Sequence, residues 1–176
     1  MKLPGYEINR SSFLSVQNDL RLVVEAMLKD ETLCKLLYYT DKDCLNKPKL
    51  TQEQVYSLVG NQIKIVPRIQ VDEEMYNYVL ISTGNYAPSK NPQFRDNTLV
   101  FDIVCNLDIW NLGNYQLRPF LIAGEIDKLF NNKHLTGIGK LEFAGMDRNI
   151  LNHNLAGYTL VYYCVHGTDD LMNKNE

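Results

Sequence analysis

The chain has 176 residues, of which 45% are hydrophobic and 22% are charged, and its formal net charge is −3. This length fits one domain with its own core, and a slightly acidic chain gives no support for nucleic-acid binding, which needs a basic face. The opening residues lack the apolar segment of a secretion signal, and the longest apolar runs are too short to span a membrane. We therefore expect one globular domain that does not contact a membrane.

Helical patterns fill the first third of the chain. Residues 1–14 contain proline, glycine and a serine pair, which predict an arm outside the folded domain. From 15 to 29 the apolar residues recur at helical spacing and form one stripe, which predicts an amphipathic helix. Asp30 is placed to cap a second short helix. Thr51, followed three residues later by Gln54, is a capping box, so another short helix should begin there.

From residue 63 onward, apolar and polar residues alternate as they do in strands. The first strand begins at Ile63 and meets Pro67, which cannot donate to a ladder, so we expect this strand at a sheet edge. A second strand is predicted from Met75 to Ser82. Residues 84–97 are interpreted as one long polar loop, and loops of that length usually indicate a functional arm or disorder.

The clearest strand is predicted from Thr98 to Trp110, with a continuous apolar row on one face. Its other face carries Asp102, Asn106 and Asp108, so we expect this face to contact water or a polar partner. A strand of this length outruns one small sheet and is expected to project toward a neighbouring protein.

A helix is predicted over 116–131, with Pro119 in its first turn. Two strands are predicted over 138–144 and 157–166, joined by a polar connection over 145–154. The order of helices, strands, helix and strands favours an α+β fold. We expect an antiparallel, possibly mixed, sheet of about four to five strands with helices packed on one face. The expected parts are an arm (1–14), a single domain (15–166) and a polar tail (167–176).

Few residues could carry catalysis. Cys164 and His166 would share one face of the last strand and could form a Cys/His dyad, although a buried cysteine beside an exposed histidine is the interpretation that we favour. Residues 137–140 contain only a fragment of a phosphate loop. Asp102 and Asp108 lie too far apart along a straight strand to bind one cation. We therefore expect no catalytic, cofactor-binding or metal site, and interpret the chain as a non-enzymatic protein.

The ordered set of elements resembles the tail-terminator and tail-completion proteins of long-tailed phages and the related head–tail joining proteins. The resemblance covers roughly residues 13–166, with 41–60 as an extra insertion. It rests on the helix from Phe13 to Lys29, the short helix from Thr32 to Tyr39, the strand that meets Pro67, the long strand ending at Asp108-Ile109-Trp110, the helix from Arg118 to Phe130, and two closing strands.

This resemblance implies a structural virion subunit at the head–tail interface, assembled in the bacterial cytoplasm as a ring of six or twelve copies. Its implied partners are other tail, neck or portal proteins, with contact to DNA in the ring lumen through Lys90 and Arg95. Tyrosine and tryptophan are enriched at protein interfaces. The residues that we expect at assembly contacts are Tyr86, Phe94, Arg95, Trp110 and Tyr115.

Other interpretations of the sequence also stay open. The same fold type serves neck-ring subunits of short-tailed phages. A small protein-binding module unrelated to virions would be a stable monomer with a specific partner. An enzyme using Cys164 would need a thiol of lowered pKa, and a nucleic-acid binder would need binding that weakens strongly with salt.

Overall fold

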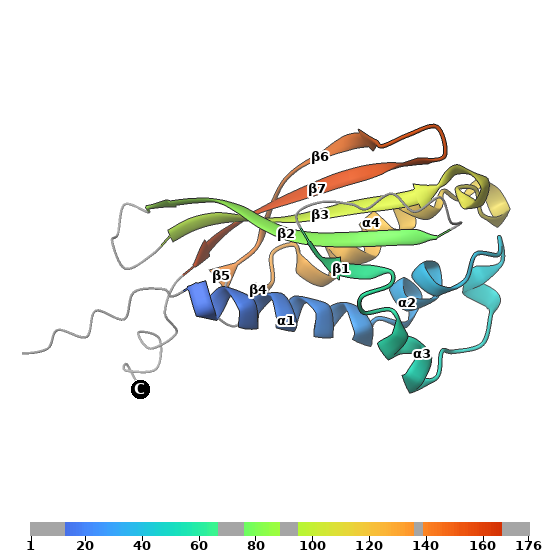
Figure 1. Cartoon of the computed structure of the whole chain (residues 1–176), viewed down its shortest axis with the longest axis horizontal. Helices are drawn as coiled ribbons and strands as arrows, with labels where there is room; N and C mark the ends of the chain where they lie inside the picture. The colour runs from blue at the N-terminus through green and yellow to red at the C-terminus, as the bar shows by residue number, and fades with distance from the viewer. Residues whose placement is uncertain (1–12, 67–75, 89–94, 136–138, 167–176) are drawn as a thin grey trace, which may run out of the picture.

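The computed structural model describes residues 13–66, 76–88, 95–135 and 139–166 (Figure 1). These residues form an α+β fold in which helices pack on one face of a mixed five-stranded sheet, as the sequence predicted. The strands lie in the order β1-β2-β3-β7-β6. The predicted tail lies outside the described residues, and so does the predicted arm except for its last two positions, which begin the first helix.

The described chain opens with three α-helices: α1 (Phe13–Lys29), α2 (Glu31–Tyr38) and α3 (Gln52–Ser57). The apolar stripe of α1 is buried in the core, as predicted. Asp30 caps α2, because its side chain accepts a hydrogen bond of 2.8 Å from the Leu33 N–H. The capping box of Thr51 and Gln54 is confirmed, since each side chain accepts from the backbone N–H of the other residue.

The main sheet consists of β1 (Ile63–Ile65), β2 (Asn77–Pro88), β3 (Arg95–Asn106), β7 (Leu155–His166) and β6 (Glu142–Ile150). The β1–β2 pair is parallel and the other pairs are antiparallel. β1 lies at an edge, as the nearby proline predicted. β4 (His134–Leu135) and β5 (Gly139–Lys140) form a separate two-stranded ribbon.

The predicted long loop over 84–97 is wrong, because most of it belongs to a hairpin. β2 continues to Pro88 and β3 begins at Arg95, so that Pro88 pairs with Arg95 and only residues 89–94 lie outside the described part. The register shifts between Gly84 and Ala87, where a bulge adds residues to β2. A polar, bulged hairpin end has the composition of a loop, which explains the error.

The strand predicted from Thr98 to Trp110 also ends earlier than expected. β3 stops at Asn106, and a short 3₁₀ helix, η2 (Leu107–Ile109), follows. The Asn106 side chain accepts a hydrogen bond of 2.9 Å from the Asp108 N–H and thereby caps η2. Asp108 is therefore not on the strand face that carries Asp102, and the long projecting strand does not form.

The polar connection predicted over 145–154 is wrong as well. Most of it is β6, which pairs with β7 from Glu142 to Ile150, and the turn that joins them is short. Of the strand predicted over 138–144, residues 139–140 form β5 and residues 142–144 begin β6. None of the β6 side chains is buried. An edge strand with little buried surface lacks the apolar alternation on which the prediction depended.

The core lies between the helices and the sheet. Phe101 of β3 stacks on Phe130 at 5.1 Å between ring centroids, and Tyr162 of β7 meets the Phe101 ring edge-on at 5.8 Å. Phe130 belongs to α4 (Arg118–Phe130), whose first turn holds a proline, as predicted. The opposite face is not wholly polar, because Val104 is buried there in a second apolar cluster with Tyr78 and two leucines. This corrects the expectation of a solvated second face.

Candidate assembly surface

Of the five residues predicted at assembly contacts, the structure describes the side chains of only Trp110 and Tyr115. Arg95 is the first residue of β3 and Trp110 lies beyond the other end of that strand, so the start of β3 and the Trp110 region are separated by the length of the strand. Tyr86 lies in β2 and Arg95 in β3, although their side chains are outside the described part, and Phe94 is outside it entirely, as is Lys90. The structure therefore tests the environment of only Trp110 and Tyr115.

Tyr115 and Trp110 have different surroundings. Tyr115 is fully exposed and has a left-handed backbone (φ 59°) at the end of the short 3₁₀ segment η3 (Gly113–Tyr115). This conformation is uncommon for a bulky residue and indicates a backbone that its surroundings constrain. Trp110 is half-buried, and its ring lies 6.3 Å from that of Tyr158.

Trp110 is part of an aromatic rim that the sequence did not reveal. Phe120, in the first turns of α4, lies 4.7 Å from the Tyr158 ring, so Tyr158 contacts both Phe120 and Trp110. Phe120 remains nearly half exposed. Phe120 lies off the buried stripe of Ile122 and Ile126. This spacing could have identified it from the sequence, because an aromatic residue on the solvent side of a helix is available for a partner.

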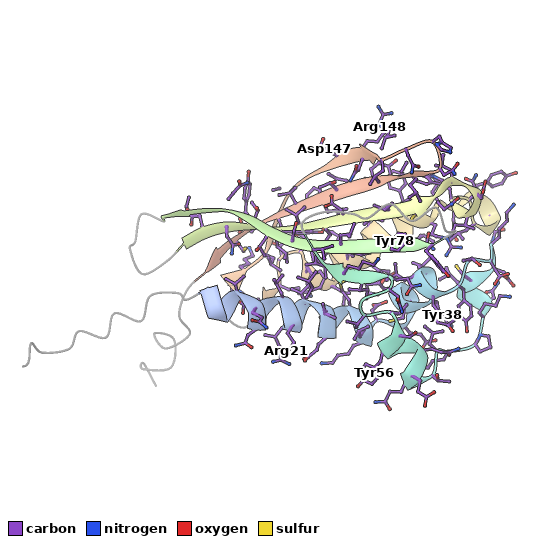
Figure 2. All side chains as sticks on the ribbon, viewed as in Figure 1. Arg21, Tyr38, Tyr56, Tyr78, Asp147 and Arg148 are labelled. Carbon is purple, nitrogen blue, oxygen red and sulfur yellow. The ribbon has the colours of Figure 1, made fainter. Side chains whose placement is uncertain are left out.

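β6 forms one margin of the molecule beside this rim. It is the last strand of the sheet, and its ladder partner is β7. Its helix-side residues include Phe143 (47% exposed) and Ile150 (62% exposed), while Asp147 lies on the other face. Figure 2 shows Asp147 and Arg148 at this outer border. We call the set the β6 margin: Phe120, Phe143, Met146, Asp147, Arg148 and Ile150.

The opposite margin is formed by β1 and the end of α3. Ile65 is 49% exposed, Val59, which bridges to Ile63 of β1, is also exposed, and so is Tyr56 of α3. Lys64 lies on the other face of the strand, with its ammonium group 5.0 Å from the centre of the Tyr78 ring. Figure 2 shows Tyr56 far from Asp147 and Arg148. We call this set the β1 margin: Tyr56, Val59, Lys64 and Ile65.

A buried arginine holds the rim in place. Arg118 has no exposed surface and donates hydrogen bonds of 2.7–3.1 Å to five backbone carbonyls. The carbonyl of Ile109 is next to Trp110, and the other four lie between Leu36 and Asp41 at the end of α2. Burial lowers the pKa of the guanidinium below its ordinary value. Arg118 thus fixes the Trp110 turn to the helical layer.

Burial disfavours the thiolate form of the four cysteines. All four are buried, and burial together with the charge of Asp19 raises the pKa of Cys164 to about 12. The Cys164 thiol contacts the Asn97 side chain, and the His166 side chain is outside the described part. Burial also raises the pKa of Cys105 to about 12 and that of Cys34 to about 11. These environments favour protonated thiols, which disfavours the Cys164/His166 dyad.

The described residues offer little else for chemistry. Two hollows of about 210 and 240 Å³ lie near Leu112 and near Leu50, and both are smaller than usual ligand sites. Within those residues, histidine, cysteine and carboxylate side chains form no group of three that could hold a metal ion. No helix in the described part combines the length and apolar character needed to cross a bilayer.

Comparison with known proteins gives two matches of different weight. The beta-ketoacyl-[acyl-carrier-protein] synthase III of Aliivibrio fischeri (strain ATCC 700601 / ES114) is 33% identical over 75 residues, which are 43% of this chain and 22% of the synthase. This chain therefore spans less than a quarter of the synthase, and the likeness says nothing about its activity. A family model described as YomW matches residues 30–164, from the start of α2 almost to the end of β7. Because this phage-type family model covers most of the chain, the protein belongs to the YomW family and is phage-related.

Proposed function

We propose that this protein is a structural, non-enzymatic virion subunit that forms a ring at the head–tail interface of a tailed phage, as a tail-terminator or head–tail joining protein. Its phage-type family supports this role, and so does the order of elements that resembles the terminator proteins. The observation that carries the proposal is the pair of exposed apolar margins at opposite edges of one sheet.

A ring needs two different surfaces on each subunit. When one surface contacts a different surface on the next copy, the contact repeats, and it closes into a ring if the rotation permits. The β1 and β6 margins satisfy this requirement, because they lie at opposite ends of the strand order. A twofold dimer would use a single margin twice. Exposed apolar groups such as Phe143 and Ile150 at a sheet edge also indicate a surface that contacts a partner.

The proposed partners are further copies of this chain, in a six-fold or twelve-fold ring, and tail, neck or portal proteins on the two faces of the ring. The non-enzymatic role is supported by the protonated state that burial favours for thiols such as Cys105 and Cys164. A lumen contact with DNA would depend on Lys90 and Arg95 at the hairpin end. With a net charge of −3, such a contact would be local rather than a property of the whole surface.

Negative-stain electron microscopy of the purified protein over a range of concentrations, with light scattering for mass, tests the proposal. A closed ring supports it, and six-fold or twelve-fold symmetry separates a tail terminator from the neck ring of a short-tailed phage. Mass spectrometry of purified virions is the second arm, because assembly on a template would leave the isolated protein monomeric. A monomer at every concentration, together with absence from virions, would refute the proposal and favour a protein-binding module.

A further inference from the structure

We infer that β6 of one subunit pairs with β1 of the next subunit, in antiparallel orientation, so that the sheets continue around the ring. The inference depends on the ring proposed above and names its contact. The occupant of the β6 margin is thus the β1 margin of a second copy. Direction, backbone orientation and side-chain character support this pairing independently.

The directions of β1 and β6 fit an antiparallel pairing between neighbouring subunits. β1 runs parallel to β2, and each step from β2 through β3 and β7 to β6 reverses the direction. β1 and β6 therefore run in opposite directions within one subunit. Two copies placed side by side in the same orientation bring β6 of one next to β1 of the other as an antiparallel pair. This geometry does not require either subunit to be inverted, so it is compatible with rotation about a ring axis, and added strands at open edges are a common mode of protein recognition.

The backbone of the β1 margin leaves one described residue open for pairing. The Ile63 N–H donates to the Leu58 carbonyl at 2.8 Å, and the Ile63 carbonyl accepts from the Gly60 N–H at 2.9 Å. The backbone groups of Ile63 therefore point away from β2 and are already satisfied. Because such groups alternate along a strand, those of Ile65 also point away from β2. Ile65 is the position at which a new ladder can begin.

The backbone groups of β6 alternate in direction so that some of them can pair with Ile65 of a neighbour. The Leu151 N–H donates to the Leu155 carbonyl at 3.0 Å, so the backbone of Leu151 faces β7. Alternation then directs the backbone groups of Met146, Arg148 and Ile150 away from β7, toward the open edge. Only these residues of the regular part of β6 can exchange hydrogen bonds with Ile65 of a neighbour.

Side-chain character selects one register among these. If Ile65 pairs with Met146, two apolar side chains meet on the helix side of the joined sheet. On the other face, Lys64 then lies opposite Asp147, which forms a cross-strand ion pair. Moving the register by two residues places Lys64 opposite Gly145 or Asn149, without a charge partner, and moving it by one residue exchanges the two faces.

The flanks of the two strands extend the contact. Tyr56 and Val59 of the β1 margin are exposed, and so are Phe120 and Ile150 of the β6 margin. An approach that pairs the strands brings these apolar groups toward each other and removes them from water. The short ladder is thus supported by apolar contact on one face and by an ion pair on the other.

Cysteine cross-linking tests the register. All four native cysteines are buried, so the background of surface thiols is low. Opposed residues in an antiparallel pair lie about 5.5 Å apart between Cα atoms, which suits a disulfide. Mild oxidation of the double variant Ile65→Cys/Met146→Cys should give a ladder of covalent multimers up to the ring size. Ile65→Cys/Ile150→Cys is the matched control, because its second cysteine lies on the same face about 13 Å further along the strand, and it should give no ladder.

Charge reversal gives a second, independent test. Lys64→Glu and Asp147→Lys should each weaken association about tenfold per contact, because an ion pair becomes a like-charge pair. An equimolar mixture of the two variants should restore rings, since alternating subunits recreate opposite charges at every contact. Rings that form normally in both variants, or equal cross-linking in the control pair, would overturn the inference and leave the proposed function standing. Failure of the wild-type chain to form rings in solution and in virions would overturn both.

Discussion

Replacing Arg118 with methionine should destabilise the fold far more than any surface substitution. The side chain donates to five carbonyls, of which those of Ile109 and Leu36 are buried. Methionine fills a similar volume but leaves the buried Ile109 carbonyl without a donor, while the Leu36 carbonyl keeps a hydrogen bond of 3.2 Å from the Asn77 side-chain amide. An unsatisfied buried polar group costs about 1–3 kcal/mol. Water can replace the donor at the partly buried carbonyls of Tyr39, Thr40 and Asp41.

One buried carbonyl at that cost, together with the bond lost at Leu36 and the weakened partly buried contacts, gives a loss of about 2–4 kcal/mol in the free energy of unfolding. Relief of the desolvated guanidinium offsets part of this loss, which is why we expect no more. Against a typical stability of about 5–15 kcal/mol, the change should be large and easily measured. Urea denaturation followed by circular dichroism should show a lower midpoint with an unchanged slope.

Two further variants separate charge from geometry. Arg118→Lys keeps the positive charge, but its single nitrogen cannot reach carbonyls on two different segments. It should therefore lose nearly as much stability as Arg118→Met. Arg148→Met, at an exposed arginine of β6, should stay within about 0.5 kcal/mol of the wild type. If Arg118→Met were equally mild, the five hydrogen bonds would contribute little, and the assigned role of Arg118 would be wrong.

Three more outcomes are expected. Gly157→Ala should prevent stable folding, because a Cβ atom there would lie 1.7 Å from the Ile103 carbonyl oxygen; a soluble variant with an unchanged melting temperature would contradict this. Burial raises the thiol pKa of Cys105 and Cys164 from 9.0 to about 12, so above pH 9 the unfolded chain releases protons that the folded chain keeps. Stability should therefore fall with rising pH between about 9 and 12, and urea midpoints that stay constant from pH 8 to 10.5 would refute this. Thr51→Ala should cost about 1 kcal/mol through loss of the helix cap, and thermal melting should detect the change.

The helical third of the chain could be predicted because its signals are local. The apolar stripe of α1 and the cap at Asp30 depend on residues within a few positions of each other. β6 and the end of the β2–β3 hairpin could not be predicted in the same way. Edge strands bury few side chains, so their alternation is weak, and their existence depends on partners such as β7 that lie elsewhere in the chain.

The candidate surface was predictable only in part. Trp110 was identified because aromatic residues at element ends suit interfaces. Its neighbours Phe120 and Tyr158 lie on α4 and β7, and only the folded chain brings them beside it. Arg118 carried no sequence signal at all, since most of its partners are carbonyls about 80 residues earlier, and carbonyls are present at every position.

That separation in sequence has a consequence for synthesis on the ribosome. The carbonyl of Leu36 emerges 82 residues before the arginine that binds it. At about 5–20 residues per second, translation of that interval takes roughly 4–16 s. Throughout this time the carbonyls of Tyr39, Thr40 and Asp41 lack their arginine donor, so the helical layer cannot reach its final packing before α4 has been made. A nascent chain that stalls short of Arg118 would therefore expose an unfinished helical layer to proteases and chaperones.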